Sequence, residues 1–97
     1  MNINFTPEAI ADLNAIHGYI AQDNARAADS VIQRILQAVA VLENFPLLGR
    51  PGQVEETREF SISNLPYFAV YEIADETRIE IIAIMHTARQ YPSEGAP

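Results

Sequence analysis

The stretch from Thr57 to Pro92 constrains the fold most, because it divides into three strand-like runs joined by two short connectors. The first run alternates polar and apolar side chains with a period of two, which is typical of a half-exposed strand. The second is rich in aromatic and β-branched residues, and the third is almost continuously apolar, as a central strand would be. The connectors, residues 64–66 and 74–77, are short, so the stretch predicts an antiparallel meander. The three runs are residues 57–63, 67–73 and 79–85.

The first half of the chain predicts one short strand, residues 3–5, followed by two helices. Thr6, Pro7 and Glu8 form a helix start, with a hydroxyl N-cap, proline in the first turn and an acid near the positive end of the helix dipole. The second helix should stop before Pro46. Each helix has one apolar stripe at spacings of three and four, so the two should form a hairpin. The stripes are Ile10, Leu13, Ile16 (or His17) and Ile20 in the first helix, and Ala28, Val31, Ile32, Ile35, Val39 and Leu42 in the second.

The predicted element order is therefore strand, helix, helix, strand, strand, strand, which defines an α+β domain. We expect a mainly antiparallel four-stranded sheet packed against the helical hairpin. A chain of 97 residues is short enough to form one domain. This domain should span residues 1–92, and residues 93–97 should form a disordered tail.

Composition narrows the classes of function. There are 13 acidic side chains and six basic ones, all of them arginine, which gives a net charge of −7. Direct DNA binding by this chain alone is not expected, because phosphate binding depends on clustered cations. Cysteine is absent, so thiolate metal sites are excluded, and no residue pattern implies another metal or an organic cofactor. Neither a membrane-spanning run nor a secretory signal is apparent, so we expect a cytoplasmic protein that does not bind membranes.

Both faces of the predicted sheet carry apolar side chains, yet two helices can cover only one face. Alternation places Phe68, Val70, Ile82 and Ile84 together on one face. A contiguous apolar patch on a small domain usually marks a partner site, so these four residues are candidate partner contacts. The opposite set of side chains could be the exposed one. Alternatively, the loop of residues 45–56 and the tail could cover the patch.

Candidate functional residues gather where the most buried strand ends, at His86 and Arg89. Arg58 could join them in a functional patch, or could pair with a glutamate across the sheet. His86 could equally be a strand-end histidine bonded to a nearby carboxylate or carbonyl. Arg50 is interpreted as a cap at the end of the second helix, and His17 as an exposed helical residue. Leu47 and Leu48 are expected to pack under the helices.

Several short patterns, taken together, resemble the RelE/ParE superfamily of toxins from bacterial toxin–antitoxin modules, and its ParE branch in particular. The resemblance covers the chain from Phe5 to Pro92. Its carrying residues are Ala9, Asp12, Leu13, Ile16, Tyr19 and Ile20; Leu42, Pro46, Gly49 and Arg50; Arg58, Glu59 and Phe60; Pro66, Tyr67, Tyr71, Glu72 and Ile73; and Ile81, Ile84, His86, Arg89, Tyr91 and Pro92.

This resemblance implies a cognate antitoxin, encoded beside the toxin, that would wrap an extended and helical segment over it. We expect the apolar face of Phe68, Val70, Ile82 and Ile84 to be its contact surface. ParE-like members inhibit DNA gyrase, whereas RelE-like members cut messenger RNA on the ribosome. Neither activity implies a cofactor.

For a nuclease, His86 could be acid or base, Arg58 and Arg89 could hold the phosphate, and Tyr91 could stack on a base. The same four residues are candidate contacts to a protein target. The chain lacks the lysine-rich surface of RelE-type relatives, which favours the gyrase interpretation. A non-toxic relative that only binds antitoxin is a third alternative.

Overall fold

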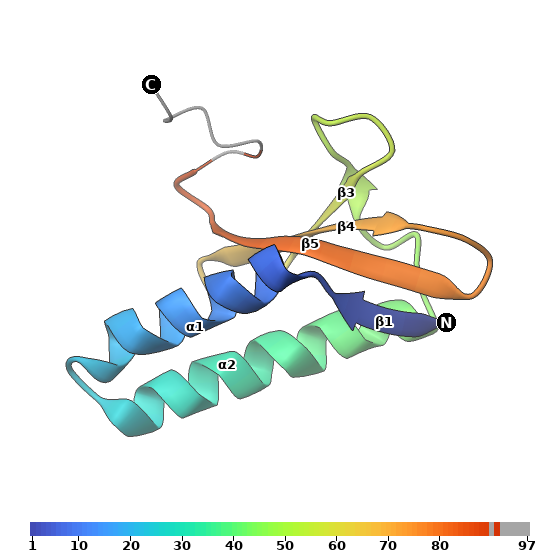
Figure 1. Cartoon of the computed structure of the whole chain (residues 1–97). Helices are drawn as coiled ribbons and strands as arrows, with labels where there is room; N and C mark the ends of the chain where they lie inside the picture. The colour runs from blue at the N-terminus through green and yellow to red at the C-terminus, as the bar shows by residue number, and fades with distance from the viewer. Residues whose placement is uncertain (90, 92–97) are drawn as a thin grey trace.

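The computed structural model describes residues 1–89 and 91, so the expected tail of residues 93–97 lies outside the described residues. Among the described residues, one strand is followed by two helices and then by four strands, close to the order that the sequence predicts. Figure 1 shows the helices side by side, covering one face of the sheet. In chain order the elements are β1 (Asn2–Phe5), α1 (Pro7–Ala21), α2 (Ala25–Ala40), the 3₁₀ helix η1 (Val41–Glu43), β2 (Arg50–Pro51), β3 (Arg58–Ser61), β4 (Tyr67–Ile73) and β5 (Arg78–His86).

The sheet has the strand order β1-β5-β4-β3-β2. The meander of β3, β4 and β5 is antiparallel, as predicted, and β1 pairs with β5 in parallel. The sheet therefore has five strands and not the expected four. The additional strand, β2, has only two residues and includes Pro51, so it has no alternation that a sequence pattern could reveal.

Local signals explain where the helices begin. The Ala9 N–H donates to the Thr6 hydroxyl over 3.1 Å, which confirms the predicted cap of α1. Asn24 caps α2 by accepting from the Ala27 N–H at 3.0 Å. The predicted stripe of α2 faces the core. In α1, however, Ala9 is fully buried while Ile10 is 48% exposed, so the core-facing stripe begins one residue earlier than expected.

The β4–β5 pairing contains a β-bulge. Val70 lies opposite Ala83, but the next residue, Tyr71, lies opposite Ile81, which leaves Ile82 without a partner. A one-residue insertion reverses which side chains share a face beyond it. The bulge therefore puts Ile84 on the helix side of the sheet, although Ile82 packs with the cluster on the far side.

The loop before β2 is held by two side chains from the sheet. The Tyr71 hydroxyl donates to the Pro46 carbonyl at 2.6 Å and accepts from the Gly49 N–H at 2.9 Å. The Arg58 guanidinium donates to the Gly49 carbonyl at 2.6 Å. A Cβ at residue 49 would lie 2.7 Å from the Tyr71 ring, so only glycine permits this close approach. Tyr71 and Arg58 together fix the loop on the sheet.

This tether overturns two expectations. Leu47 and Leu48 do not pack under the helices but are 66% and 53% exposed, because the loop backbone is pinned with these side chains outward. Arg50 does not cap α2. It lies in β2, and its guanidinium donates to the Glu59 carboxylate at 3.2 Å.

Replacing Gly18 with alanine should raise the free energy of unfolding by about 0.5–1 kcal/mol, because glycine in a helix interior costs conformational entropy. A Cβ at residue 18 would meet no atom within 4 Å, so nothing opposes this gain. Thermal unfolding followed by circular dichroism checks it. A lower melting temperature than that of the native sequence would contradict the account of α1.

Candidate partner-binding groove

The end of β5 is held in place by contacts from three parts of the chain. The Thr87 N–H donates to the Pro66 carbonyl at 2.9 Å, and the Arg89 N–H donates to the His86 carbonyl at 2.9 Å. The pairing of β5 with β1 ends at Ile81, and farther along β5 the Ile84 N–H donates to the Asp12 carboxylate of α1 at 3.0 Å. His86 and Arg89 therefore project from a well-anchored strand end.

Beside this strand end is a groove of about 560 Å³ between α1 and the sheet. Tyr67 lies opposite His86 in the sheet, and their rings meet edge-on with centroids 5.6 Å apart. Tyr19 of α1 also lines the groove and is 75% exposed. The groove thus combines exposed aromatic surface with one arginine. Its lining is Asp12, Ala15, Ile16, Tyr19, Tyr67, Met85, His86, Ala88 and Arg89.

His86 has one ring nitrogen engaged and one directed elsewhere. Its Nδ1 accepts the Ala88 N–H at 3.0 Å, which requires Nδ1 to be unprotonated and leaves the proton of the neutral ring on Nε2. Nε2 is therefore the ring nitrogen that remains for contact with a ligand.

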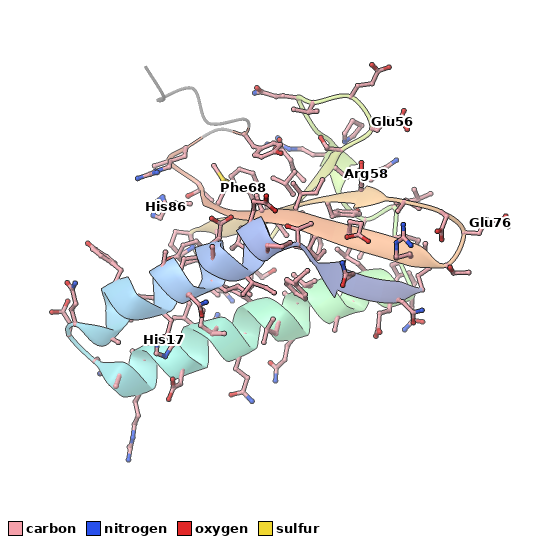
Figure 2. The ribbon with its side chains drawn as sticks, in the orientation of Figure 1. His17, Glu56, Arg58, Phe68, Glu76 and His86 are labelled. Atoms are coloured by element: carbon pink, nitrogen blue, oxygen red, sulfur yellow. The ribbon has the colours of Figure 1, made fainter. Side chains whose placement is uncertain are left out.

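The four target-binding candidates do not form one site. Arg58 lies opposite Tyr71 of β4, whereas His86 lies opposite Tyr67 of the same strand. Tyr67 and Tyr71 are four residues apart, which corresponds to about 13 Å along the strand at about 3.3 Å per residue. Figure 2 shows Arg58 and His86 well apart along the sheet. Arg58 donates to the carbonyls of Leu47 and Gly49, and among the described residues it forms no ion pair with a glutamate. Arg58 is a clamp for the loop.

Tyr91 lies on the far face of the sheet, away from the helices, and packs against the cluster of Phe68, Val70 and Ala83. A small hollow of about 150 Å³ lies nearby and is bordered by Arg50, Gln53, Glu59, Ser61, Phe68, Thr87, Arg89 and Tyr91. Arg89 borders both this hollow and the groove. Of the four candidates, His86 and Arg89 line the groove, while Tyr91 packs on the far face of the sheet.

The proposed antitoxin contacts are also divided. Ile84 is buried among the side chains that face the helices, so the expectation that it shares a face with Phe68 and Val70 is wrong. Phe68 is 9% exposed and Val70 is fully buried on the far face. Tyr91 packs on this face, and the loop residues Arg50 and Gln53 border the hollow beside Phe68. Ile82 alone of the four remains half-buried.

The sequence patterns did not indicate Asp12 or Tyr19 as groove residues, although both belong to the helix motif on which the family resemblance rests. Their signal was their spacing of seven, which places them on one side of α1. Among the described residues, no group of three or more His, Cys, Asp or Glu side chains could hold a metal ion. No helix within residues 1–89 combines the length and apolar character needed to cross a bilayer.

Comparison with known proteins places this chain and its fold among toxins of toxin–antitoxin systems. The chromosomal ParDE toxin–antitoxin system of P. aeruginosa contains a chain with TM-score 0.78 and 27% identity, over 89% of this chain and 95% of that one. Residues 3–91 match the family described as ParE toxin of type II toxin-antitoxin system, parDE. The chain belongs to this family of toxins.

Two relatives match over nearly their whole length. A candidate toxin of Sinorhizobium fredii, Y4kP, is 38% identical over 90 residues, which cover 93% of this chain and 92% of the relative. Toxin RelE2 of Caulobacter vibrioides is 35% identical over 85 residues, which cover 88% of this chain and 93% of that toxin. The fold class and the superfamily predicted from the sequence are confirmed.

Proposed function

We propose that this toxin inhibits DNA gyrase by binding it through the groove at the end of β5, and that a cognate antitoxin neutralises it. The observation that carries the proposal is that Arg58 does not line the groove that holds His86 and Arg89. RNA cleavage without a metal needs concentrated positive charge around the scissile phosphate. Arg89 is the single cation among the described residues that line the groove. Such a surface is better suited to anchoring a protein than to cutting RNA.

The groove has the composition of a protein-binding surface. Tyrosine and arginine are enriched among the residues that dominate binding energy at protein interfaces. Tyr19 and Arg89 are exposed here, and the fixed strand end and α1 hold them on opposite sides of the groove. The net charge of −7 and the absence of lysine add support, because ribosomal RNA would repel the acidic surface.

A ribosome-dependent messenger RNA endonuclease is the second candidate. The similarity to toxin RelE2 and the proximity of His86 and Arg89 in one groove favour it. His86 would then exchange a proton through Nε2, since Nδ1 is engaged by Ala88.

Paired assays with the purified chain test the proposal. We expect inhibition of gyrase supercoiling of relaxed plasmid, with intact messenger RNA in a translation extract at the same concentration. Codon-linked cutting of messenger RNA without any effect on gyrase would establish the second candidate instead. A chain inactive in both assays that still binds the product of the adjacent gene would be a non-toxic relative.

A further inference from the structure

The last part of β5 has an edge that no strand covers among the described residues. β1 pairs with β5 only as far as Ile81, whereas β5 continues to His86. Figure 1 shows the chain leaving the sheet after β1 to form α1. In place of a strand, α1 supplies the Asp12 carboxylate, which accepts the Ile84 N–H at 3.0 Å. The groove between α1 and the end of β5 therefore runs along a sheet edge.

The bond to Asp12 shows which way the backbone of this edge points. Within a strand, the N–H and C=O groups of one residue point to the same side, and successive residues alternate. Because the Ile84 N–H points toward α1, the Ile84 carbonyl and the His86 N–H point to that side as well. The Thr87 N–H points the opposite way, as alternation requires, and donates to the Pro66 carbonyl at 2.9 Å.

Two of these outward groups are engaged and two are not. Asp12 holds the Ile84 N–H, and the His86 carbonyl accepts the Arg89 N–H at 2.9 Å. Outside the ladder with β4, no hydrogen bond among the described residues engages the Ile84 carbonyl or the His86 N–H. These two groups flank Met85, and both Met85 and His86 line the groove. The edge thus offers one backbone acceptor and one backbone donor to a ligand.

We propose that an extended segment of DNA gyrase enters the groove and adds a strand to β5, parallel to it, by bonding to the Ile84 carbonyl and the His86 N–H. The inference rests on the proposed inhibition of gyrase and specifies how the groove holds this target. Protein segments commonly bind by adding a strand to an exposed sheet edge. A helix could not do so, because its own backbone groups are already bonded.

The pattern of engaged and free groups favours a parallel strand over an antiparallel one. In a parallel pair, one residue of the added strand donates to the carbonyl before the residue opposite it and accepts from the N–H after that residue. A residue opposite Met85 would therefore use both free groups at once. An antiparallel strand would need both groups of Ile84 or both groups of His86, and one of each pair is already bonded.

Side chains and charge set the remaining features of the segment. A residue opposite Met85 would point to the far face with it, and its two neighbours would point to the helix side, as Ile84 does. Ile16 and Tyr67 line the groove there, so these neighbours should be apolar. Arg89 follows β5 and is the single arginine among the described residues that line the groove, on a chain with a net charge of −7. An acidic residue should therefore follow the apolar ones.

Hydrogen exchange on the native chain tests this inference with purified DNA gyrase. We expect exchange of the His86 amide hydrogen to slow at least tenfold when gyrase is added, because that N–H becomes bonded. The amide of Glu76, in the turn at the other end of β5, should exchange as before. Mass spectrometry with fragmentation to single residues provides the measurement. A complex that forms but leaves His86 exchange unchanged would overturn this inference alone.

A pair of substitutions tests the same N–H by affinity. His86→Pro removes it and puts a ring where the carbonyl of the added strand would lie, and proline is tolerated on edge strands. His86→Ala is the matched control, since it loses the same imidazole and its bond to the Ala88 N–H but keeps the backbone N–H. By calorimetry, we expect His86→Pro to bind gyrase at least tenfold more weakly than His86→Ala. Circular dichroism establishes that both fold, and the exchange measurement decides if His86→Pro does not.

Three results would go against the inference. Equal affinities of the two folded variants for gyrase would overturn it and leave the proposed function in place. Slowing of His86 exchange by the product of the adjacent gene, without slowing by gyrase, would assign this edge to the antitoxin. If the native chain does not bind gyrase at all, the proposed function fails, and the inference fails with it.

Discussion

Replacing Tyr71 with phenylalanine should lower the free energy of unfolding by about 2–3 kcal/mol, although it removes a single oxygen atom. That oxygen bonds both the Pro46 carbonyl and the Gly49 N–H in the core. Phenylalanine would leave the buried Gly49 N–H and the partly buried Pro46 carbonyl unpaired, and a buried unpaired group costs about 1–3 kcal/mol before the loop relaxes. Chemical denaturation in urea measures the difference.

The exposed Tyr19 provides the matched control for this substitution, since Tyr19→Phe removes the same oxygen from a residue that is 75% exposed. We expect that variant to unfold within about 0.5 kcal/mol of the native chain. Equal losses for the two variants would contradict the role of Tyr71 as the clamp of the loop.

The same residue predicts a pH dependence. Burial raises the pKa of Tyr71, and this outweighs the lowering by the Gly49 N–H bond and the nearby Arg58. The folded state therefore holds the proton more tightly than the unfolded state, in which tyrosine titrates near about 10. This contribution is fully present below that pH and is lost as the pH rises through the folded value. The alkaline loss of stability should be smaller in Tyr71→Phe.

Removing the two exposed anchors of the groove, in a Tyr19→Ala and Arg89→Ala double variant, should raise the half-inhibitory concentration against gyrase at least tenfold. Interface anchors of these types commonly contribute about 2 kcal/mol or more each, and about 1.4 kcal/mol corresponds to a factor of ten. Both side chains are exposed, so the melting temperature should change little. Supercoiling titrations and thermal unfolding provide the two measurements.

Arg26→Ala is the control for the lost charge, because Arg26 is exposed and does not line the groove. It should inhibit gyrase as the native chain does. Full inhibition by the double variant would show that gyrase is bound elsewhere on the toxin.

The sequence predicted the elements well because their signals are local. Thr6 caps α1 through its own hydroxyl, and the α2 stripe needs only the 3.6-residue period. Placing Ile84 required knowledge of the bulge opposite Val70, which depends on how two strands pair and leaves no mark in either strand alone. The face assignment of the last strand therefore failed, although its extent was right.

The candidate site was predicted only where its residues are close in sequence. His86 and Arg89 are three residues apart, and the structure does place them in one groove. Arg58 was added to that pair by its residue type alone. Its true partners are backbone carbonyls of Leu47 and Gly49, groups that every residue possesses and that no sequence pattern distinguishes. Residue identities therefore could not predict these tertiary contacts to backbone atoms.

The most direct test of the central claim is sedimentation of the purified toxin with purified DNA gyrase and, separately, with purified ribosomes. We expect the native chain to sediment with gyrase, the Tyr19→Ala and Arg89→Ala double variant to do so far more weakly, and neither to sediment with ribosomes. Stable association of the native chain with ribosomes, together with no association with gyrase, would contradict the proposed function.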